Sequence, residues 1–449
     1  MSSAWDQIVS LIRRSRFIGR LAALAFGGRA RQVLLGASTL LVGSGVSRII
    51  TIAVMPLLTR LYNPDDFGLL AVFTGLISIL APVVTLRYAI TLPIPRKDSL
   101  AFSLALISAI SMIVITGLIA FVLWLCGPEL LGLISMEKLA PWSWLIVLGI
   151  IGTASYELLT MWATRKRVYS LIARTNISQS LVGSLVKIAL GLIALQPIGL
   201  LIGQVVTQAG GGARLLRGFA SDIVENARYV SLRRLGVVAW CYRDFPLWRV
   251  PAQLLMALSI QSPLLGIAAI YDSEKAGQFG LAMMALTIPV GLLGQSASKA
   301  LYGEASVLIK SSPSQIYVVA KQVQRNLFVL ALVPMFLLVL YGPEMFTFFF
   351  GQEWRLAGVF AAIMSVPMVF QFTSMPLIQL MSLLSTQRPF LIINVIRFLS
   401  IVLILWAAAQ REPKIEYVVL FLSIFTTVFY FGVSVFILRG VRSLQNRVA

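Results

Sequence analysis

The chain has 449 residues and a formal charge of +20, from 37 Lys and Arg against 17 Asp and Glu. Hydrophobic residues make up 58% of it and charged residues only 12%, whereas soluble domains carry roughly 25% charge. Histidine is absent, which excludes histidine-based proton relays, acid–base catalysis and metal sites. This composition predicts an integral membrane protein, whose positive charge orients its loops, and it argues against a nucleic-acid partner.

A basic segment, residues 1–32, precedes the first apolar span. Ile8, Leu11 and Phe17 alternate there with arginines, which suits an amphipathic helix on the inner leaflet. A disordered cytoplasmic tail is the alternative interpretation. The segment does not have the compact apolar stretch and cleavage site of a signal peptide.

Apolar stretches long enough to cross a bilayer follow one another along the rest of the chain. A helix needs roughly 20 apolar residues to cross the hydrocarbon. We expect twelve transmembrane helices, near 33–58, 67–86, 99–125, 141–162, 171–194, 198–217, 245–270, 277–300, 326–341, 357–384, 389–409 and 415–438. The expected architecture is an all-α polytopic membrane protein. It has two six-helix bundles, 33–217 and 245–438, a cytoplasmic linker, 218–244, and a cytoplasmic tail, 439–449.

The charges in the loops alternate in sign along the chain. Loops on the side of the N-terminus carry most of the Lys and Arg, including Arg165, Lys166 and Arg167, and the opposite loops carry most of the acids. An excess of Lys and Arg marks the cytoplasmic side, so both termini are expected in the cytoplasm.

A short internal repeat supports the division into two bundles. Tyr62–Gly68, between the first two spans, matches Tyr271–Gly277, between spans seven and eight. Each half contains an even number of expected spans, so the two repeats share one orientation. Their pseudo-twofold axis would run along the membrane normal.

Charged residues inside the expected spans are candidates for function, because a charge in the bilayer is costly and usually faces a cavity. Glu157 is the acid among them; it could bind a coupling cation or proton, or pair with a neighbouring arginine. Arg87 lies at the cytoplasmic end of span two, where Arg249 could join it at a cavity mouth. A cavity lined by such cations attracts anions such as phosphate, and the alternative for each is a structural ion pair or a snorkelling side chain. The cations are Arg48, Arg174, Lys187, Arg249, Lys299 and Arg397. We single out Arg48, Lys187, Arg397, Arg249 and Arg87 as candidate substrate-binding residues.

Three stretches resemble a known family. Residues 57–76 (LLTRLYNPDDFGLLAVFTGL), 276–306 and 350–377 resemble segments of the bacterial polysaccharide flippases that export O-antigen-type repeat units. These flippases belong to the multidrug/oligosaccharidyl-lipid/polysaccharide exporter superfamily. The resemblance implies two six-helix bundles arranged as a V around a central cavity.

The resemblance also implies a function and a place in the cell. It implies a transporter, not an enzyme, that moves a polyprenyl-diphosphate-linked oligosaccharide across the bacterial inner membrane for O-antigen, capsule or exopolysaccharide synthesis. Implied partners are this lipid-linked glycan, the bilayer and a glycan polymerase or export machinery. No cofactor is expected; energy would come from an ion gradient or the membrane potential. The alternatives are a multidrug cation antiporter of the same superfamily and a membrane glycan polymerase or ligase.

Overall fold

The computed structural model describes residues 28–311, 313–381 and 387–448, and in these ranges it is helical without β-strands. Most of the predicted basic segment, residues 1–27, lies outside them. The first half of the described chain contains α3 (Gly28–Leu61), α4 (Pro64–Val84), η1 (Ala89–Thr91), α5 (Asp98–Gly132), η2 (Glu137–Trp142), α6 (Ser143–Arg165), α7 (Tyr169–Leu192), α8 (Ile198–Ala209), α9 (Gly212–Gly218), α10 (Ala220–Ala227) and α11 (Leu232–Cys241). The second half contains η3 (Phe245–Arg249), α12 (Val250–Ile270), α13 (Ser273–Ser311), α14 (Pro313–Phe350), η4 (Gln352–Trp354), α15 (Arg355–Met381), α16 (Gln387–Arg411) and α17 (Ile415–Val448).

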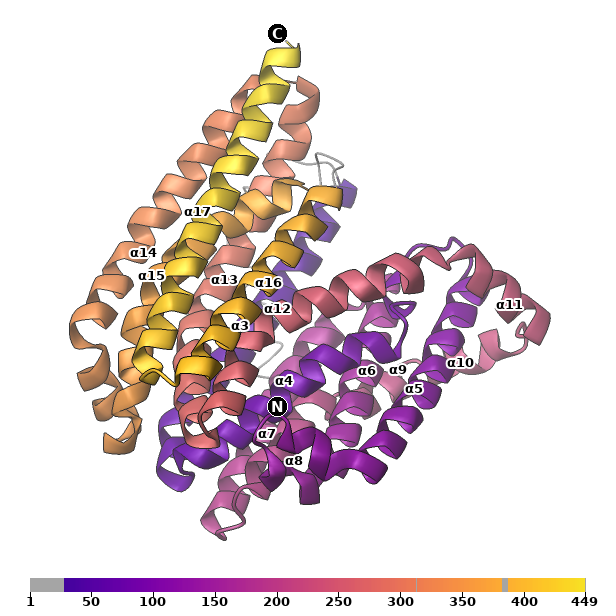
Figure 1. Cartoon of the computed structure of the whole chain (residues 1–449). Helices are drawn as coiled ribbons and strands as arrows, with labels where there is room; N and C mark the ends of the chain where they lie inside the picture. The colour runs from indigo at the N-terminus through magenta and orange to yellow at the C-terminus, as the bar shows by residue number, and fades with distance from the viewer. Residues whose placement is uncertain (1–27, 312, 382–386, 449) are drawn as a thin grey trace, which may run out of the picture.

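The helices form two inclined groups that meet at one end and diverge at the other, as a V (Figure 1). One group contains α4 to α11 and the other contains α13 to α17. The two halves touch mainly where α4 packs on α12 and α13. The helix α3 lies along α7 and also contacts α13 and α14, so it bridges the halves. Within the expected linker, 218–244, α10 and α11 pack on α5.

The expected all-α polytopic architecture is confirmed, but the number of membrane spans is not. Among the described residues, nine helices are long and apolar enough to cross a membrane. The expected spans at 171–194, 198–217 and 277–300 are not among them. The first contains Arg174 and Lys187, and the second is divided into α8, of 12 residues, and the short α9. The total of twelve therefore stays a prediction.

Two helices run further than their apolar stretches indicate. The helix α14 continues through Gly342 and Pro343 to Phe350. The helix α5 continues to Gly132, but Cys126 interrupts it with φ −127° and ψ 19°. Pro128 follows Cys126, and proline removes a helical hydrogen bond and crowds the preceding turn, which explains the kink.

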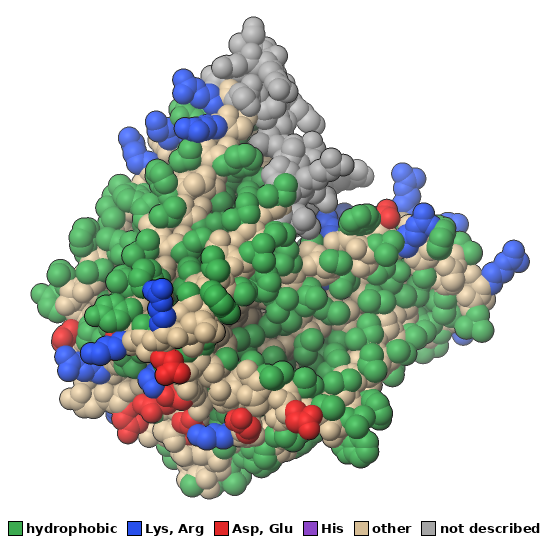
Figure 2. All heavy atoms as spheres, in the orientation of Figure 1, with side chains coloured by type: hydrophobic (Ala, Val, Ile, Leu, Met, Phe, Trp, Pro, Cys, Tyr) green, Lys and Arg blue, Asp and Glu red, His purple; other side chains and the backbone are tan. Residues whose placement is uncertain are grey.

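Acidic side chains gather at one end of the molecule, among a smaller number of basic ones, and the opposite end carries mainly basic side chains (Figure 2). Acidic residues lie where the two halves meet, and we call this the acidic end. It includes Asp65, Asp66, Asp272, Glu274 and Glu353. Basic side chains dominate the diverging ends of both halves, which we call the basic end. Its residues include Arg165, Lys166, Arg167, Arg228, Arg233, Arg234, Arg439 and Arg442.

The helix α4 begins at a capping box. The Asn63 side chain accepts a hydrogen bond from the Asp66 amide at 2.8 Å, and the Asp66 carboxylate accepts one from the Asn63 amide at 3.2 Å. Pro64, in the first turn, brings a backbone φ already suited to a helix. These local signals begin the helix at the acidic end.

One hydrophobic core joins the two halves at the acidic end. Trp354 is fully buried there, with Phe67 of the first half edge-on at 4.9 Å between ring centroids. The Trp354 indole donates to the Thr59 carbonyl at 3.2 Å. The Gln278 side chain accepts from the Ala357 amide at 2.9 Å and orders the turn that holds Trp354. The halves are therefore closed at the acidic end.

Candidate substrate cavity

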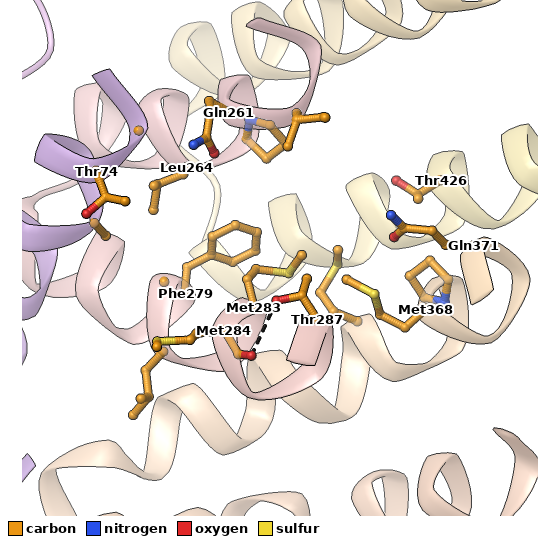
Figure 3. Close-up of a pocket in the computed structure, with 18 of the residues that line it drawn as sticks. Thr74, Gln261, Leu264, Phe279, Met283, Met284, Thr287, Met368, Gln371 and Thr426 are labelled. Carbon is orange, nitrogen blue, oxygen red and sulfur yellow. Dashed lines mark hydrogen bonds between the residues drawn. The ribbon is translucent and has the colours of Figure 1, made fainter. Parts of the chain in front are cut away.

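A cavity of about 710 Å³ lies between the two halves. Side chains from α3, α4, α7 and α8 line one side, and side chains from α12, α13, α15, α16 and α17 line the other. Apolar side chains such as Phe279, Met283 and Met368 predominate in the lining, and Figure 3 shows polar side chains such as Gln261 and Gln371 among them. Methionine is unbranched and polarizable, so such walls can adapt to a flexible apolar group.

Lys187 reaches the cavity from the first half. It lies on α7 with 8% of its surface exposed, and its Nζ donates to Gln204 Oε1 of α8 at 2.7 Å. Its stem passes beside Gly203, where an added Cβ would overlap Lys187 Cγ. The close approach of α7 and α8 at this glycine therefore holds the lysine in place.

Tyr62 supports the same turn of α7. Its hydroxyl donates to the Lys187 carbonyl at 2.8 Å. Burial raises the pKa of Tyr62 to about 12, and the charge of Asp66 acts in the same direction. The phenol is therefore protonated at neutral pH and remains a donor.

Arg397 reaches the cavity from the second half. It lies on α16, and its guanidinium carbon is 5.5 Å from the Tyr430 ring centre and 6.0 Å from that of Phe429, both on α17. Cation–π contacts of this kind stabilise a partly desolvated guanidinium without removing its charge. The fork of N–H donors remains suited to an anion.

Arg48 connects the two halves beside the cavity. It lies on α3, and its Nη1 lies directly against Gly291 of α13, at the position that a Cβ there would occupy. Arg48 itself does not line the cavity. It contacts the second half through its guanidinium and its helix.

Arg87 and Glu157 form an ion pair of 3.1 Å in the first half. Arg87 Nη2 is also 3.4 Å from Gln253 Oε1 of α12, so the pair extends to the second half. Neither residue lines the cavity, and Arg249 is exposed at the end of η3. The structure thus shows the ion pair that the sequence left open for Glu157, while an ion-coupling role stays a prediction.

The charges on the cavity wall have one sign. Among its described lining residues are Lys187 and Arg397, and neither Asp nor Glu. Cationic groups on largely apolar walls are suited to an amphiphilic anion, and they oppose a lipophilic cation.

Two glutamines are among the polar residues that sequence reasoning missed at this site. Gln204 holds the Lys187 ammonium, and Gln261 of α12 lines the opposite wall (Figure 3). The signal for Gln261 is an amide inside an otherwise apolar span, since such groups tend to face a cavity. The partnership of Gln204 with Lys187 depends on the crossing of α7 and α8, which spacing along the chain does not reveal.

The long apolar helices, the V and the central cavity define a multi-pass membrane protein with the fold of the lipid-flippase and multidrug transporter superfamily. The lipid II flippase MurJ in its inward closed conformation is similar over 89% of this chain and 87% of that one, at 12% identity and TM-score 0.69. MATE in complex with MaL6 is similar over 93% and 97%, at 14% identity and TM-score 0.61. A point mutant of the Vibrio cholerae MATE transporter VcmN is similar over 92% and 97%, at 14% identity and TM-score 0.58.

The chain belongs to the family described as "Polysaccharide biosynthesis protein", whose model matches residues 57–358. This confirms the family expected from residues 57–76 and 276–306. No curated protein sequence matches the chain.

Proposed function

We propose that this protein is a flippase that moves a polyprenyl-diphosphate-linked oligosaccharide across the bacterial inner membrane. One observation carries the proposal: Lys187 and Arg397, one from each half, line a single cavity whose described lining residues include no acid. The diphosphate loses its water on entering the bilayer and needs counter-charges there. Lysine and arginine supply them, with charge-assisted hydrogen bonds to phosphate oxygens.

The V suggests how the headgroup crosses. The halves are closed at the acidic end and diverge at the basic end (Figures 1 and 2). By the positive-inside rule, the basic end faces the cytoplasm in this proposal, and both termini are proposed to lie on the same side of the membrane. The headgroup then enters from the cytoplasm, the polyprenyl tail stays in the lipid between the halves, and rocking of the halves releases the sugar outside.

The proposal extends to the pathway and the energy source. The product supplies O-antigen, capsule or exopolysaccharide synthesis, with a glycan polymerase or export machinery as the next partner. The membrane potential or an ion gradient drives the cycle, with Glu157 as the candidate coupling group. Arg48, Arg87 and Arg249 act at the junction of the halves and at the basic mouth.

The fold is shared by the lipid II flippase MurJ and by the MATE multidrug transporters, so it suits two different kinds of substrate. A multidrug cation antiporter would need negative groups around its substrate, and the described cavity wall has none. The cavity charge therefore favours the anionic lipid. A cation antiporter, the rival function, would instead transport a cationic dye across the membrane of vesicles.

Reconstitution tests the proposal directly. Purified protein in proteoliposomes should move a polyprenyl-diphosphate oligosaccharide, labelled on its terminal sugar, from one leaflet to the other. Lys187→Met and Arg397→Met should each slow this movement about tenfold, because each removes one counter-charge and keeps an apolar stem. Lys321→Met, an exposed cation of α14 outside the cavity, is the matched control. A wild-type protein that does not move the lipid, or unchanged rates in both cavity variants, would contradict the proposal.

A further inference from the structure

A second and smaller pocket, of about 300 Å³, lies within the first half. It is an open recess formed by α3, α6, α7 and α8, and its lining residues are uncharged side chains that carry a hydroxyl or an amide. They include Ser47, Tyr156, Asn176, Gln179 and Gln208. We call it the amide pocket. Every residue that lines it carries a polar group, whereas apolar side chains predominate in the lining of the central cavity.

The amide pocket adjoins the central cavity on the side of Lys187. Thr207 of α8 lines both spaces. Along α8, Gln204 binds the Lys187 ammonium, and Gln208 faces the amide pocket about one helical turn, ~5.4 Å, further on. Along α7, Ser184 lines the cavity and Ser180 lines the pocket. A group bound at Lys187 and a group in the amide pocket are therefore close enough to be covalently linked neighbours.

The hydrogen bonds in the pocket leave both donors and acceptors unused. The Tyr156 hydroxyl donates to Asn176 Oδ1 at 2.7 Å, which leaves the Asn176 amide nitrogen for a ligand. Thr153 Oγ1 donates to Gln208 Oε1 at 3.2 Å, which likewise leaves the Gln208 nitrogen. Gln179 donates to the Gln208 carbonyl at 3.4 Å and keeps its own side-chain oxygen as an acceptor.

This mixture of unused hydrogen-bond donors and acceptors favours one chemical class of ligand. An anion needs donors or positive charge, and a cation needs acceptors or negative charge, whereas a sugar hydroxyl both donates and accepts. The volume is about ten times the ~30 Å³ that one water occupies in the liquid, which suits a single sugar ring and not a whole repeat unit.

We infer that the amide pocket binds the sugar ring joined directly to the diphosphate, while Lys187 holds the diphosphate itself. The inference rests on the proposed function and adds a specificity site to it. Asn176 and Gln208 contact the sugar hydroxyls, and the remainder of the headgroup lies in the central cavity, whose wall also carries the amides of Gln261 and Gln371.

Binding measurements with two lipids test this inference. One probe is bare polyprenyl diphosphate, and the other is the same lipid carrying the repeat unit extracted from the producing cells. Wild-type protein in nanodiscs should bind the glycosylated lipid about tenfold more tightly than the bare lipid, through several hydrogen bonds. Asn176→Leu and Gln208→Leu should each reduce this ratio to about twofold and leave the affinity for the bare lipid unchanged.

The controls separate the sugar site from the proposed function. Gln410→Leu removes an exposed amide outside both pockets and should keep the wild-type ratio. The sugar site would be overturned, and a water-filled pocket identified, by either of two results. One is equal binding of both lipids by wild type, and the other is a wild-type preference for the glycosylated lipid in both pocket variants. Loss of both lipids in both variants would also count against a separate sugar site. Wild-type protein that binds neither lipid would instead overturn the proposed function.

Discussion

Gly68 and Gly277 pack reciprocally where the two halves meet. An added Cβ at Gly68 of α4 would overlap the carbonyl of Ser273, the first residue of α13. An added Cβ at Gly277 of α13 would overlap the carbonyl of Pro64, the first residue of α4. Each glycine therefore contacts the start of the other helix, as expected for two elements related by a pseudo-twofold axis.

Alanine at either glycine should destabilise the closed acidic end. The obstacle is backbone and not the end of a flexible side chain, so α4 and α13 must separate. We expect Gly68→Ala and Gly277→Ala each to lower the free energy of unfolding by about 1–3 kcal/mol, measured by denaturation in detergent. Gly117→Ala and Gly432→Ala are matched controls, because nothing lies within 4 Å of their added Cβ. Equal stability in all four variants would refute this packing.

Trp354 should be the strongest single anchor between the halves. Trp354→Ala removes a fully buried indole and its contact with Phe67, and should cost about 3–5 kcal/mol in unfolding free energy. Trp354→Phe keeps most of the ring and loses the hydrogen bond to Thr59, for roughly 1 kcal/mol. Trp124→Ala, with 80% of the residue exposed, should change stability by under about 0.5 kcal/mol. A smaller loss at position 354 than at position 124 would contradict the packing.

The Arg87–Glu157 pair should couple more strongly than an exposed pair. Its side chains are only 17% and 24% exposed, whereas those of Lys138 and Asp65 are 63% and 31% exposed. A double-mutant cycle of Arg87→Gln and Glu157→Gln should give a coupling of about 1–3 kcal/mol in unfolding free energy. The matched cycle at Lys138 and Asp65 should give less than about 1 kcal/mol, because water screens it. A larger coupling energy for Lys138 and Asp65 than for Arg87 and Glu157 would show that burial does not decide the strength of these pairs.

We expect a substitution at Gly291 to affect transport by displacing the Arg48 guanidinium. A Cβ at Gly291 would meet the end of a long, flexible side chain, which can move aside at little cost in stability. Under the proposed function, Gly291→Ala should slow lipid movement severalfold and leave thermal unfolding near wild type. The double variant Gly291→Ala with Arg48→Ala should move lipid no more slowly than Arg48→Ala alone, since both changes act through one guanidinium. Additive losses in the transport rate would contradict this link.

The sequence alone determined the properties that depend on composition and local pattern. Apolar runs predict membrane helices because backbone N–H and C=O groups in the bilayer must be hydrogen-bonded within the chain, and a helix satisfies them. The repeat of Tyr62–Gly68 at Tyr271–Gly277 predicts two related halves. Each of these signals is a short run of consecutive residues, so it can be recognised without coordinates.

Only the tertiary structure decided which charged residues share the cavity. Lys187 and Arg397 line it, whereas Arg48 lies against Gly291 and Arg87 pairs with Glu157. Each residue turns a helix by about 100°, so the direction of a side chain depends on how its helix is rotated and crossed by its neighbours. That rotation is set by contacts between residues far apart in the chain, such as Gly203 beside Lys187 and Phe67 beside Trp354.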